Sequence, residues 1–336
     1  MNEPLTFSPS HLLTLSSVAV EAVCACVPGN AVANDEKAEK ATGIRTRRIA
    51  AEGTSVVDLC VWAAEKAIAE TESKPDDFGA VLFVSFTQPN RMPAAACEAQ
   101  ARLGFPKGII AFDVSLACSG WGYGLYLAAL LAQQTGKKTL LLDGDVQSAK
   151  VGRGDGEKAG DVSPLLADAG TATIVSPSHP LAPSPSHPLT FAFLSDGEKG
   201  GALQLKDGGT IQMDGFGVFR FVATDVVSYI KDFTRLLTLS PSHPLTFSPS
   251  HPLTFVPHQP NVYMVRQLAK SVGIAEEQTA ISCDELGNLS SASIPATIAW
   301  KGVRGRILFA GFGGGLSVSL GLIEIDPSCK LSVLEV

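Results

Sequence analysis

The sequence predicts an α/β protein in which strands and helices alternate along the chain. Short, nearly continuous apolar runs of strand length recur, and segments with apolar residues at helical spacing lie between them. Both halves of the chain also pass through a similar order of elements, which suggests an internal duplication. Buried strands separated by helices favour a largely parallel sheet. With 336 residues, 45% of them hydrophobic, the chain is long enough to bury a large core.

The first half contains five predicted strands and three predicted helices. Glycines at 104 and 136 follow two of these helices, where a left-handed backbone ends a helix at least cost. In chain order the elements are strand 17–29, helix 56–70, strand 79–87, helix 94–104, strand 108–115, helix 119–136, strand 138–145 and strand 170–176.

The second half repeats this alternation after a proline-rich stretch. Apolar residues at helical spacing predict three helices, and apolar runs predict strands before and after them. The elements are helix 219–237, strand 253–256, helix 261–274, helix 292–300, strand 306–312 and strand 316–325.

Composition excludes several classes of function. A formal net charge of −7 argues against a general nucleic-acid-binding surface. No apolar run reaches the roughly 18 to 20 residues of a membrane helix, and the N-terminus lacks the pattern of a signal peptide. Seven cysteines are scattered through apolar surroundings, which fits reduced thiols better than a disulfide framework. We therefore expect a cytoplasmic protein.

A Ser-Pro-Ser-His unit recurs five times, and most copies extend to SPSHPLTF. Five of the six histidines lie in these copies, so a metal site built from them is one interpretation. The prolines exclude a helix, and they lack the backbone N–H groups that strand pairing needs. The copies also fall between regular elements. We therefore favour inserted surface repeats and predict no metal. Of the segments that end the repeat copies (the repeat tails), only 253–256 is expected to form a strand. The predicted insertions are 5–16, 176–191 and 239–255.

Cys118 is the first candidate for chemistry. It lies where a buried strand meets a glycine-bearing, mostly apolar helix. The exposed N–H groups at a helix N-terminus favour a thiolate, so the sequence predicts a lowered thiol pKa and a nucleophile. The alternative is an ordinary core cysteine.

His258 and Asn288 are further candidates. His258 is the one histidine outside the repeats and follows a predicted strand, at the edge where open α/β sheets bind ligands. Asn288 follows a glycine and precedes a run of small hydroxylated residues. The glycines 313–315 lie between two strands, where bare N–H groups would face an oxyanion, or where the chain simply makes a tight turn.

Taken together and in this order, these segments resemble the β-ketoacyl-(acyl-carrier-protein) synthase III family of the thiolase superfamily. The resemblance covers residues 18–325, interrupted by the repeats. It is carried by GIRTRRIA, by ACSGWGYGL around Cys118, by PHQPN around His258, by GNLSSASIP around Asn288 and by GFGGG.

The resemblance implies a thiolase-like fold, with two similar α/β halves in a five-layer αβαβα arrangement, usually as a homodimer. The halves would be 17–175, with the nucleophile, and 192–326, with the histidine and the asparagine. The resemblance also implies that Cys118, His258 and Asn288 form a catalytic set. The backbone N–H groups of Cys118 and Gly314 would form the oxyanion hole.

The implied reaction is a decarboxylative condensation. Cys118 accepts an acyl group from a thioester, malonyl-acyl carrier protein loses CO2, and the resulting enolate attacks the acyl-cysteine to give a 3-oxoacyl product. No metal or redox cofactor is implied; the substrates are pantetheine thioesters of coenzyme A or of acyl carrier protein. Nucleic-acid and membrane partners are not expected.

Further residues match family positions. Gly215, Phe219 and Asn261 match the pantetheine tunnel, Met92 a residue that reaches into the partner subunit's acyl pocket, and Arg220 the carrier-protein docking face. Three positions depart from the family: Lys37 and Ala41 stand where members that use acyl-coenzyme A usually have a tryptophan and an arginine, and Tyr263 stands at an arginine position.

Two alternative functions stay open. One is acyl transfer to an oxygen or nitrogen acceptor without decarboxylation, by the same fold and nucleophile. The other is a catalytically inactive thiolase-like scaffold.

Overall fold

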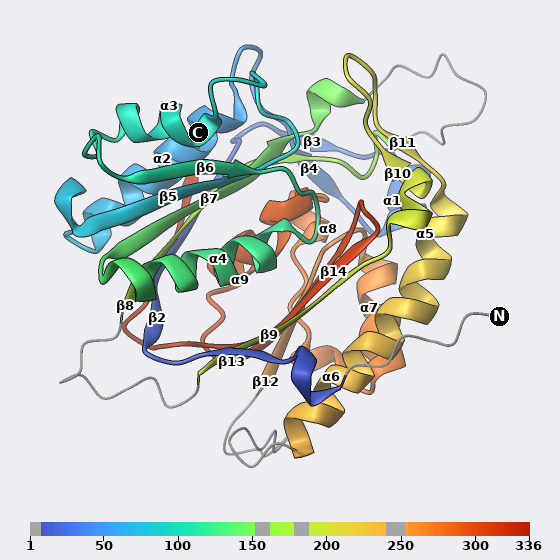
Figure 1. Ribbon diagram of the computed structural model, residues 1–336. Helices are drawn as coiled ribbons and strands as arrows, with labels where there is room; N and C mark the ends of the chain where they lie inside the picture. Colours follow the sequence, from blue (N-terminus) through green and yellow to red (C-terminus); the bar gives the residue numbers. More distant parts are fainter. Residues whose placement is uncertain (1–7, 152–161, 178–187, 240–252) are drawn as a thin grey trace.

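The computed structural model describes residues 8–151, 162–177, 188–239 and 253–336. Two β-sheets enclose a central pair of helices, and further helices cover the outer face of each sheet (Figure 1). This is the predicted five-layer αβαβα arrangement. We propose that the two sheets correspond to the predicted halves 17–175 and 192–326.

The first sheet has six strands and takes one of them from the end of the chain. Residues 330–335 form β15 beside β2, in parallel, so the C-terminal segment returns to the N-terminal half. Helices α2 (Val56–Glu70) and α3 (Ala95–Arg102) cover its outer face. Its strand order is β15 (Lys330–Glu335), β2 (Val18–Val27), β8 (Asp168–Pro177), β7 (Lys138–Val146), β5 (Phe78–Val84) and β6 (Ile110–Val114).

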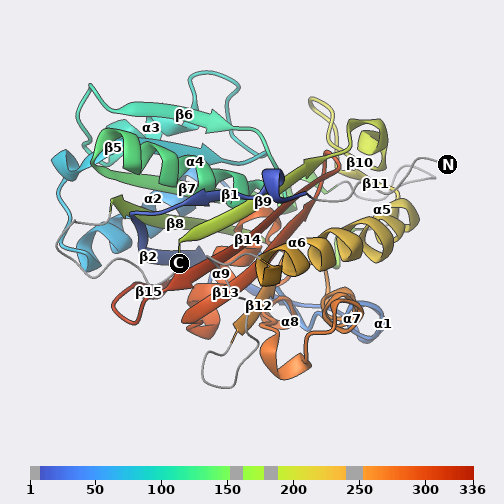
Figure 2. The ribbon, with the colours of Figure 1, turned by 60° about the horizontal axis from the view of Figure 1, so that its bottom comes forward.

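The second sheet has five strands and lies on the other side of the central helices (Figure 2). Helices α6 (Val227–Leu239) and α7 (Val262–Val272) pack on its outer face through an apolar cluster that includes Phe233, Phe255 and Leu268. The strand order is β1 (Leu13–Leu15), β9 (Leu189–Ser195), β14 (Ser317–Ile325), β13 (Gly305–Gly313) and β12 (Leu253–Pro257).

Helices α4 (Gly120–Thr135) and α9 (Ser293–Lys301) form the central layer. Both are apolar on most sides because a sheet lies on each side of them. Trp121 is fully buried on α4 and packs edge-to-face on Phe309 of β13 at 5.2 Å. Helix α4 therefore contacts both sheets, and Cys118 lies two residues before its first residue.

Smaller elements complete the chain. They are α1 (Glu36–Thr42), β3 (Ala31–Ala33), β4 (Thr46–Arg48), β10 (Leu203–Gln204), β11 (Gln212–Met213), α5 (Gly215–Phe221), α8 (Cys283–Leu286) and a 3-10 turn at Ser290–Ala292. A π-helical segment, Val222–Val226, joins α5 to α6 within the predicted helix 219–237. No helix in the described ranges is long and apolar enough to cross a bilayer.

The expectation of largely parallel sheets was wrong. β7 and β8 are antiparallel, as are β13 and β14. No α-helix occurs among the described residues between the strands of either pair, and a parallel pairing needs a long crossover. Their residues are apolar on both faces because helices cover both sides of each sheet, so the apolar pattern did not distinguish the two pairings.

The tails of three repeat copies form strands, although only the tail at 253–256 was expected to do so. Residues 13–15 form β1, and residues 189–191 begin β9. These two tails pair with each other in antiparallel register, with Thr14 opposite Thr190. The third tail begins β12, and residues 178–187 and 240–252 lie outside the described residues.

Candidate active site

Cys118 lies in the short connection between β6 and α4, two residues before the helix begins. Its side chain packs directly on β13, since a Cβ added at Gly313 would lie 2.7 Å from the Cys118 Cβ. Any side chain at position 313 would therefore displace the cysteine. The glycine places the thiol against the second sheet.

The predicted lowering of the Cys118 thiol pKa was wrong. Burial raises the pKa of Cys118 to about 12. A hydrogen bond from Ser290 and the backbone groups of Cys118 and Gly314 lower the pKa, but by less than burial raises it. An apolar environment disfavours the charged thiolate, and here this cost exceeds the effect of the nearby helix. The resting nucleophile is therefore a neutral thiol.

The turn after β13 is fixed by three serine hydroxyls. Ser119 and Ser317 share a hydrogen bond of 2.7 Å, and Ser317 donates to the Gly314 carbonyl at 2.9 Å. Ser319 donates to the Ser119 carbonyl at 2.8 Å. These bonds join the beginning of α4 to the glycine turn, so the backbone at Gly314 is held near Cys118.

Asn288 is anchored by both its backbone and its side chain. Gln147 donates to the Asn288 carbonyl at 2.7 Å and to the Ala167 carbonyl at 2.8 Å. The Asn288 side-chain oxygen accepts the Ser290 backbone N–H at 2.9 Å. With Oδ1 engaged in this way, the amide Nδ2 is the group left to act on a ligand.

His258 follows β12 directly and is 3% exposed. Its backbone N–H donates to the Ala310 carbonyl at 2.7 Å, and its ring packs edge-on against Phe312 at 5.4 Å. Burial lowers the pKa of His258 to about 3, and the Ser290 backbone raises that pKa by less. The imidazole is therefore neutral at any physiological pH.

Ser290 is where the three predicted catalytic residues meet. Its hydroxyl oxygen is 3.9 Å from the Cys118 sulfur, its N–H holds Asn288, and its backbone acts on the His258 ring. No role was predicted for Ser290 from the sequence. The run of small hydroxylated residues after Asn288 was the available signal, because such side chains can pack closely around a nucleophile while donating hydrogen bonds.

A cavity of about 460 Å³ opens onto Cys118, Asn288, Ser290 and Gly314. Three tunnel residues inferred from the resemblance, Gly215, Phe219 and Asn261, line it as well. The rest of the lining is mainly apolar: Phe86, Ala117, Val162, Leu165, Leu166, Leu203, Leu205, Ile211, Met213, Val218, Pro260 and Met264. This shape and polarity suit a flexible chain with an apolar end.

Three predicted residues do not line this cavity: His258, Met92 and Arg220. Met92 is 86% exposed, and Arg220 lies exposed on α5 beside a separate hollow lined by Phe216 and Asp214. A larger open groove of about 1000 Å³ runs along α7 outside the cavity and is lined by Ala41, Tyr263 and Lys270 among others. The groove is not lined by Cys118, so the smaller cavity is the candidate active site.

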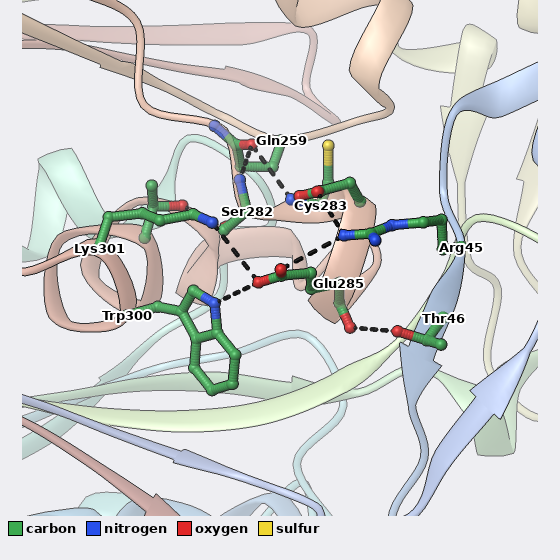
Figure 3. Close-up of polar contacts among 10 residues, drawn as sticks. Arg45, Thr46, Gln259, Ser282, Cys283, Glu285, Trp300 and Lys301 are labelled. Atoms are coloured by element: carbon green, nitrogen blue, oxygen red, sulfur yellow. Dashed lines mark hydrogen bonds and ion pairs between the residues drawn. The ribbon is translucent and has the colours of Figure 1, made fainter.

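Gln259 fixes the segment next to His258. It is 1% exposed; its amide donates to the Pro257 carbonyl at 2.9 Å and to the Ala280 carbonyl at 3.1 Å. Its oxygen accepts the backbone N–H groups of Ser282 at 3.1 Å and Cys283 at 3.4 Å, at the start of α8 (Figure 3). Both hydrogen-bonding groups of this amide are used within the protein.

Residues from the N-terminal half hold the other end of α8. Thr46 donates to the Glu285 carbonyl at 2.7 Å, and Arg45 pairs with the Glu285 carboxylate at 3.3 Å (Figure 3). Trp300 of α9 donates to the same carboxylate at 2.7 Å. Helix α8 leads into Gly287 and Asn288, so these bonds tie Asn288 to both halves of the chain.

No cluster of metal-ligating side chains occurs in the part of the chain that the structure describes. His11 is the only repeat histidine within that part. It lies in a 3-10 turn, where Ser8 donates its backbone N–H to His11 Nδ1 at 2.9 Å. The other four repeat histidines lie outside the described residues.

Two protein-family models match the chain. Residues 112–197 match 3-oxoacyl-(acyl-carrier-protein) synthase III, and residues 246–325 match the C-terminal part of the same enzyme. The first match contains Cys118, and the second contains His258 and Asn288.

Similar proteins cover nearly the whole chain. The β-ketoacyl-(acyl-carrier-protein) synthase III of Serratia proteamaculans is 30% identical over 306 residues, which are 87% of this chain and 91% of the relative. The enzyme of that name from Aquifex aeolicus is 27% identical over 84% of this chain and 88% of its own. The crystal structure of a Burkholderia xenovorans 3-oxoacyl-(acyl-carrier-protein) synthase is 28% identical, with a TM-score of 0.86 over 97% of this chain and 99% of its own. The chain therefore belongs to the β-ketoacyl-(acyl-carrier-protein) synthase III family.

Proposed function

We propose that this acyltransferase condenses an acyl thioester with malonyl-acyl carrier protein, with loss of CO2, to give a 3-oxoacyl product through an acyl-Cys118 intermediate. The observation that carries the proposal is that Cys118, His258 and Asn288 all lie around Ser290, and that Cys118, Asn288 and Ser290 line one apolar cavity. A thiol, a neutral imidazole and a carboxamide are the groups that this reaction requires.

The first half-reaction transfers the acyl group to sulfur. The Cys118 sulfur attacks the thioester carbonyl, and the carbonyl oxygen becomes an oxyanion. The backbone groups of Cys118 and Gly314 act on the sulfur and lower its pKa. We propose that their N–H groups donate to the oxyanion that forms on the thioester oxygen next to this sulfur. The carrier thiol leaves, and the acyl group remains on Cys118.

The second half-reaction forms the carbon–carbon bond. Loss of CO2 from the malonyl group leaves an enolate, which neutral hydrogen-bond donors stabilise. The Asn288 Nδ2 group and a neutral His258 supply such donors, because the pKa of His258 is lowered to about 3 by burial. The enolate carbon attacks the acyl-Cys118 carbonyl, the thiol leaves with a proton, and the 3-oxoacyl product is released.

The reaction needs no reagent beyond Cys118 and the two thioester substrates. No atom changes its oxidation state by exchange with an external reagent, and CO2 release makes the condensation favourable. We therefore propose that the enzyme takes its acyl and malonyl groups as pantetheine thioesters and uses no metal or redox cofactor.

Arg220 and the exposed aromatic residues beside it are proposed to bind the carrier protein. Phe216 is 75% exposed and Phe219 is 48% exposed, and Phe219 also lines the cavity. An exposed basic side chain on α5, the helix that also carries the cavity residue Phe219, favours an acidic carrier. Arg220→Glu should raise the KM for acyl carrier protein and leave the KM for a free pantetheine thioester unchanged.

A homodimer is proposed on the basis of the exposed edge of the first sheet. β6 is its last strand, and Ile110 and Phe112 on this strand are 41% and 36% exposed. Apolar edge strands pair readily with another chain. Met92, whose family position reaches into the partner subunit's acyl pocket, is also exposed, which fits a subunit interface. Phe112→Lys should give monomers by light scattering if β6 is the interface.

We also propose a cytoplasmic location. All seven cysteines are free thiols, which is the state maintained in a reducing compartment.

Intact mass spectrometry with a panel of acyl-coenzyme A and acyl-carrier donors tests the enzyme assignment. The protein should gain one acyl mass; Cys118→Ser should lose this adduct, and Cys97→Ser, which changes an exposed thiol outside the cavity, should retain it. Absence of an adduct with every donor would favour an inactive scaffold.

Radiolabelled malonyl carrier protein separates the two kinds of acyltransferase. The acylated enzyme should release labelled CO2 in step with the 3-oxoacyl product. If the adduct forms, no CO2 is released and the acyl group passes to an oxygen or nitrogen acceptor, the enzyme carries out the alternative acyl transfer and not the condensation.

A further inference from the structure

Gln147 is a buried polar residue on the wall of the cavity that contains Cys118. It follows the last residue of β7 directly, is 3% exposed, and lines the cavity. Burial of a side-chain amide is unfavourable unless hydrogen bonds compensate for the lost water. The partners of its nitrogen and of its oxygen therefore decide what this side chain does.

The amide nitrogen of Gln147 is used within the protein. Nε2 donates to the Asn288 carbonyl at 2.7 Å and to the Ala167 carbonyl at 2.8 Å. Because an amide NH2 group has two hydrogens, both are engaged. The reversed amide would place Oε1 against two carbonyl oxygens, so these two acceptors fix which end of the amide is the oxygen.

The amide oxygen of Gln147 has no partner within the described part of the chain. No donor of that part makes a hydrogen bond to Oε1, and protein atoms do not enclose this oxygen. An oxygen that is neither bonded nor enclosed faces open space. Since Gln147 is almost fully buried and lines the cavity, this space is the cavity.

The wall around this oxygen is apolar. Leu165 and Leu166 line the cavity and belong to one apolar cluster, and they directly precede Ala167, whose carbonyl binds the amide nitrogen. Gln204 is a further amide on the cavity, but it is partly exposed. Oε1 of Gln147 is thus a buried acceptor in apolar surroundings, and such an acceptor selects ligands that supply a donor.

The acyl group of a bound thioester is the part that meets this wall. Phe219, Asn261 and Met264 line both the cavity and the open groove along α7, so they mark the end through which a carrier arm enters. Gln147 lines the cavity but not the groove. With the thioester carbonyl at Cys118 and the arm directed to the groove, the acyl chain occupies the remaining, inner part of the cavity.

We propose that Gln147 is a specificity-determining residue that selects acyl groups with a hydroxyl, which donates its hydrogen to Oε1. This inference rests on the proposed function, because that function makes the ligand an acyl thioester. An unsubstituted acyl chain displaces water from Oε1 and supplies no donor, which leaves a buried acceptor unpaired. A hydroxylated chain replaces the lost water with one hydrogen bond.

Calorimetric titration with inert analogues tests the preference apart from catalysis. The ligands are hexanoyl, 2-hydroxyhexanoyl, 3-hydroxyhexanoyl and 6-hydroxyhexanoyl amides of the pantetheine arm, in which N–H replaces the thioester sulfur, so that Cys118 is not acylated. Wild-type protein should bind the best of the hydroxylated ligands about three- to tenfold more tightly than the hexanoyl ligand, the range for one neutral hydrogen bond.

Gln147→Leu should reverse the order. The hydroxyl would then lose water without gaining a partner, so the hexanoyl ligand should bind about tenfold more tightly than its hydroxylated forms. The substitution also removes the bonds to Ala167 and Asn288, which lowers every affinity; the ratio of two affinities within one enzyme is unaffected by that common loss. Phe86→Leu is the matched control, because it changes an apolar side chain of the same cavity and should leave the ratio in favour of the hydroxylated ligand.

Wild-type protein that binds the hexanoyl ligand at least as tightly as every hydroxylated one would overturn the proposal, and this measurement requires no variant to fold. An unchanged ratio in Gln147→Leu would also overturn it, since Oε1 would then serve an N–H of the pantetheine arm that all the ligands share. Thioesters of the same acyl groups separate this inference from the proposed function. A binding preference without an acyl adduct would contradict the proposed function alone, and an adduct without any preference would contradict the inference alone.

Discussion

The Ser290 backbone N–H donates to the Asn288 side-chain oxygen at 2.9 Å and so sets the direction of the whole carboxamide. Because this bond uses Oδ1, the amide directs Nδ2 to a ligand.

Asn288→Asp is the variant that tests this orientation. An aspartate keeps an oxygen for the Ser290 N–H, but it presents a second, negative oxygen to the enolate. We expect acylation of Cys118 to be retained and decarboxylation to fall by about 100-fold or more, as for the loss of one oxyanion donor. Release of labelled CO2 from malonyl carrier protein by pre-acylated enzyme measures this. Equal losses in both half-reactions would show that Asn288 acts on the acyl transfer as well.

His258 should make decarboxylation independent of pH over the physiological range. Its pKa is lowered to about 3 by burial, so the imidazole stays neutral from pH 8 down to about 4. Single-turnover CO2 release should therefore show no inflection near pH 6.5, and His258→Ala should acylate normally but fail to condense. An inflection near pH 6.5 that vanishes in His258→Ala would contradict the neutral role.

Asp143→Asn should stabilise the protein, and more so as the pH rises. The folded-state pKa of Asp143 is raised above its unfolded value by burial, so between these values the unfolded chain releases a proton that the folded chain keeps. This ionisation favours unfolding by up to about 1.4 kcal/mol for each pH unit above roughly pH 4. Thermal unfolding should give similar Tm values for wild type and variant at pH 4. At pH 6 and 8 the Tm of the variant should exceed that of wild type by an increasing amount. A constant difference would mean that the carboxyl ionises in the folded state.

Gln259→Met should weaken both stability and condensation. The substitution keeps the volume but leaves two N–H groups and two carbonyls without the partner amide, at a cost of about 3 kcal/mol. Denaturant unfolding measures this loss. Because the bonds fix the segments that carry His258 and lead to Asn288, kcat for condensation should fall while acyl-adduct formation is retained. Loss of the adduct together with condensation would point to general unfolding instead.

The elements were predicted best where local pattern decides the structure. The expected helix 56–70 has the same bounds as α2, because Ser55 caps its first turn and apolar residues recur at helical spacing. Strand direction was predicted poorly, since β8 and β14 are buried on both faces and look like parallel strands. The strands at 13–15 and 189–191 were missed because the prolines beside them dominate the local pattern.

The electrostatics of the candidate site could not be predicted from the sequence. Cys118, His258 and Asn288 each carried a local signal, whereas the role of Ser290 depends on a contact across 172 residues. The direction of the Cys118 pKa shift depends on the apolar cavity around it. No local pattern gives the depth of burial, and burial is the larger effect here.

The pairing of β1 with β9, and the beginning of β12 at Leu253, have a consequence for the gene. Each of these strands starts within the final three residues of a repeat copy. In the tandem pair that begins at Ser240 and Ser248, only the last copy supplies β12, and Phe255 always precedes His258 by three residues. Duplication or loss of a whole octapeptide upstream keeps the sequence from Leu253 to His258, and should therefore leave the pairing of β12 with β13 unchanged. We therefore expect the number of repeat copies before Leu253 to leave the position of His258 unchanged.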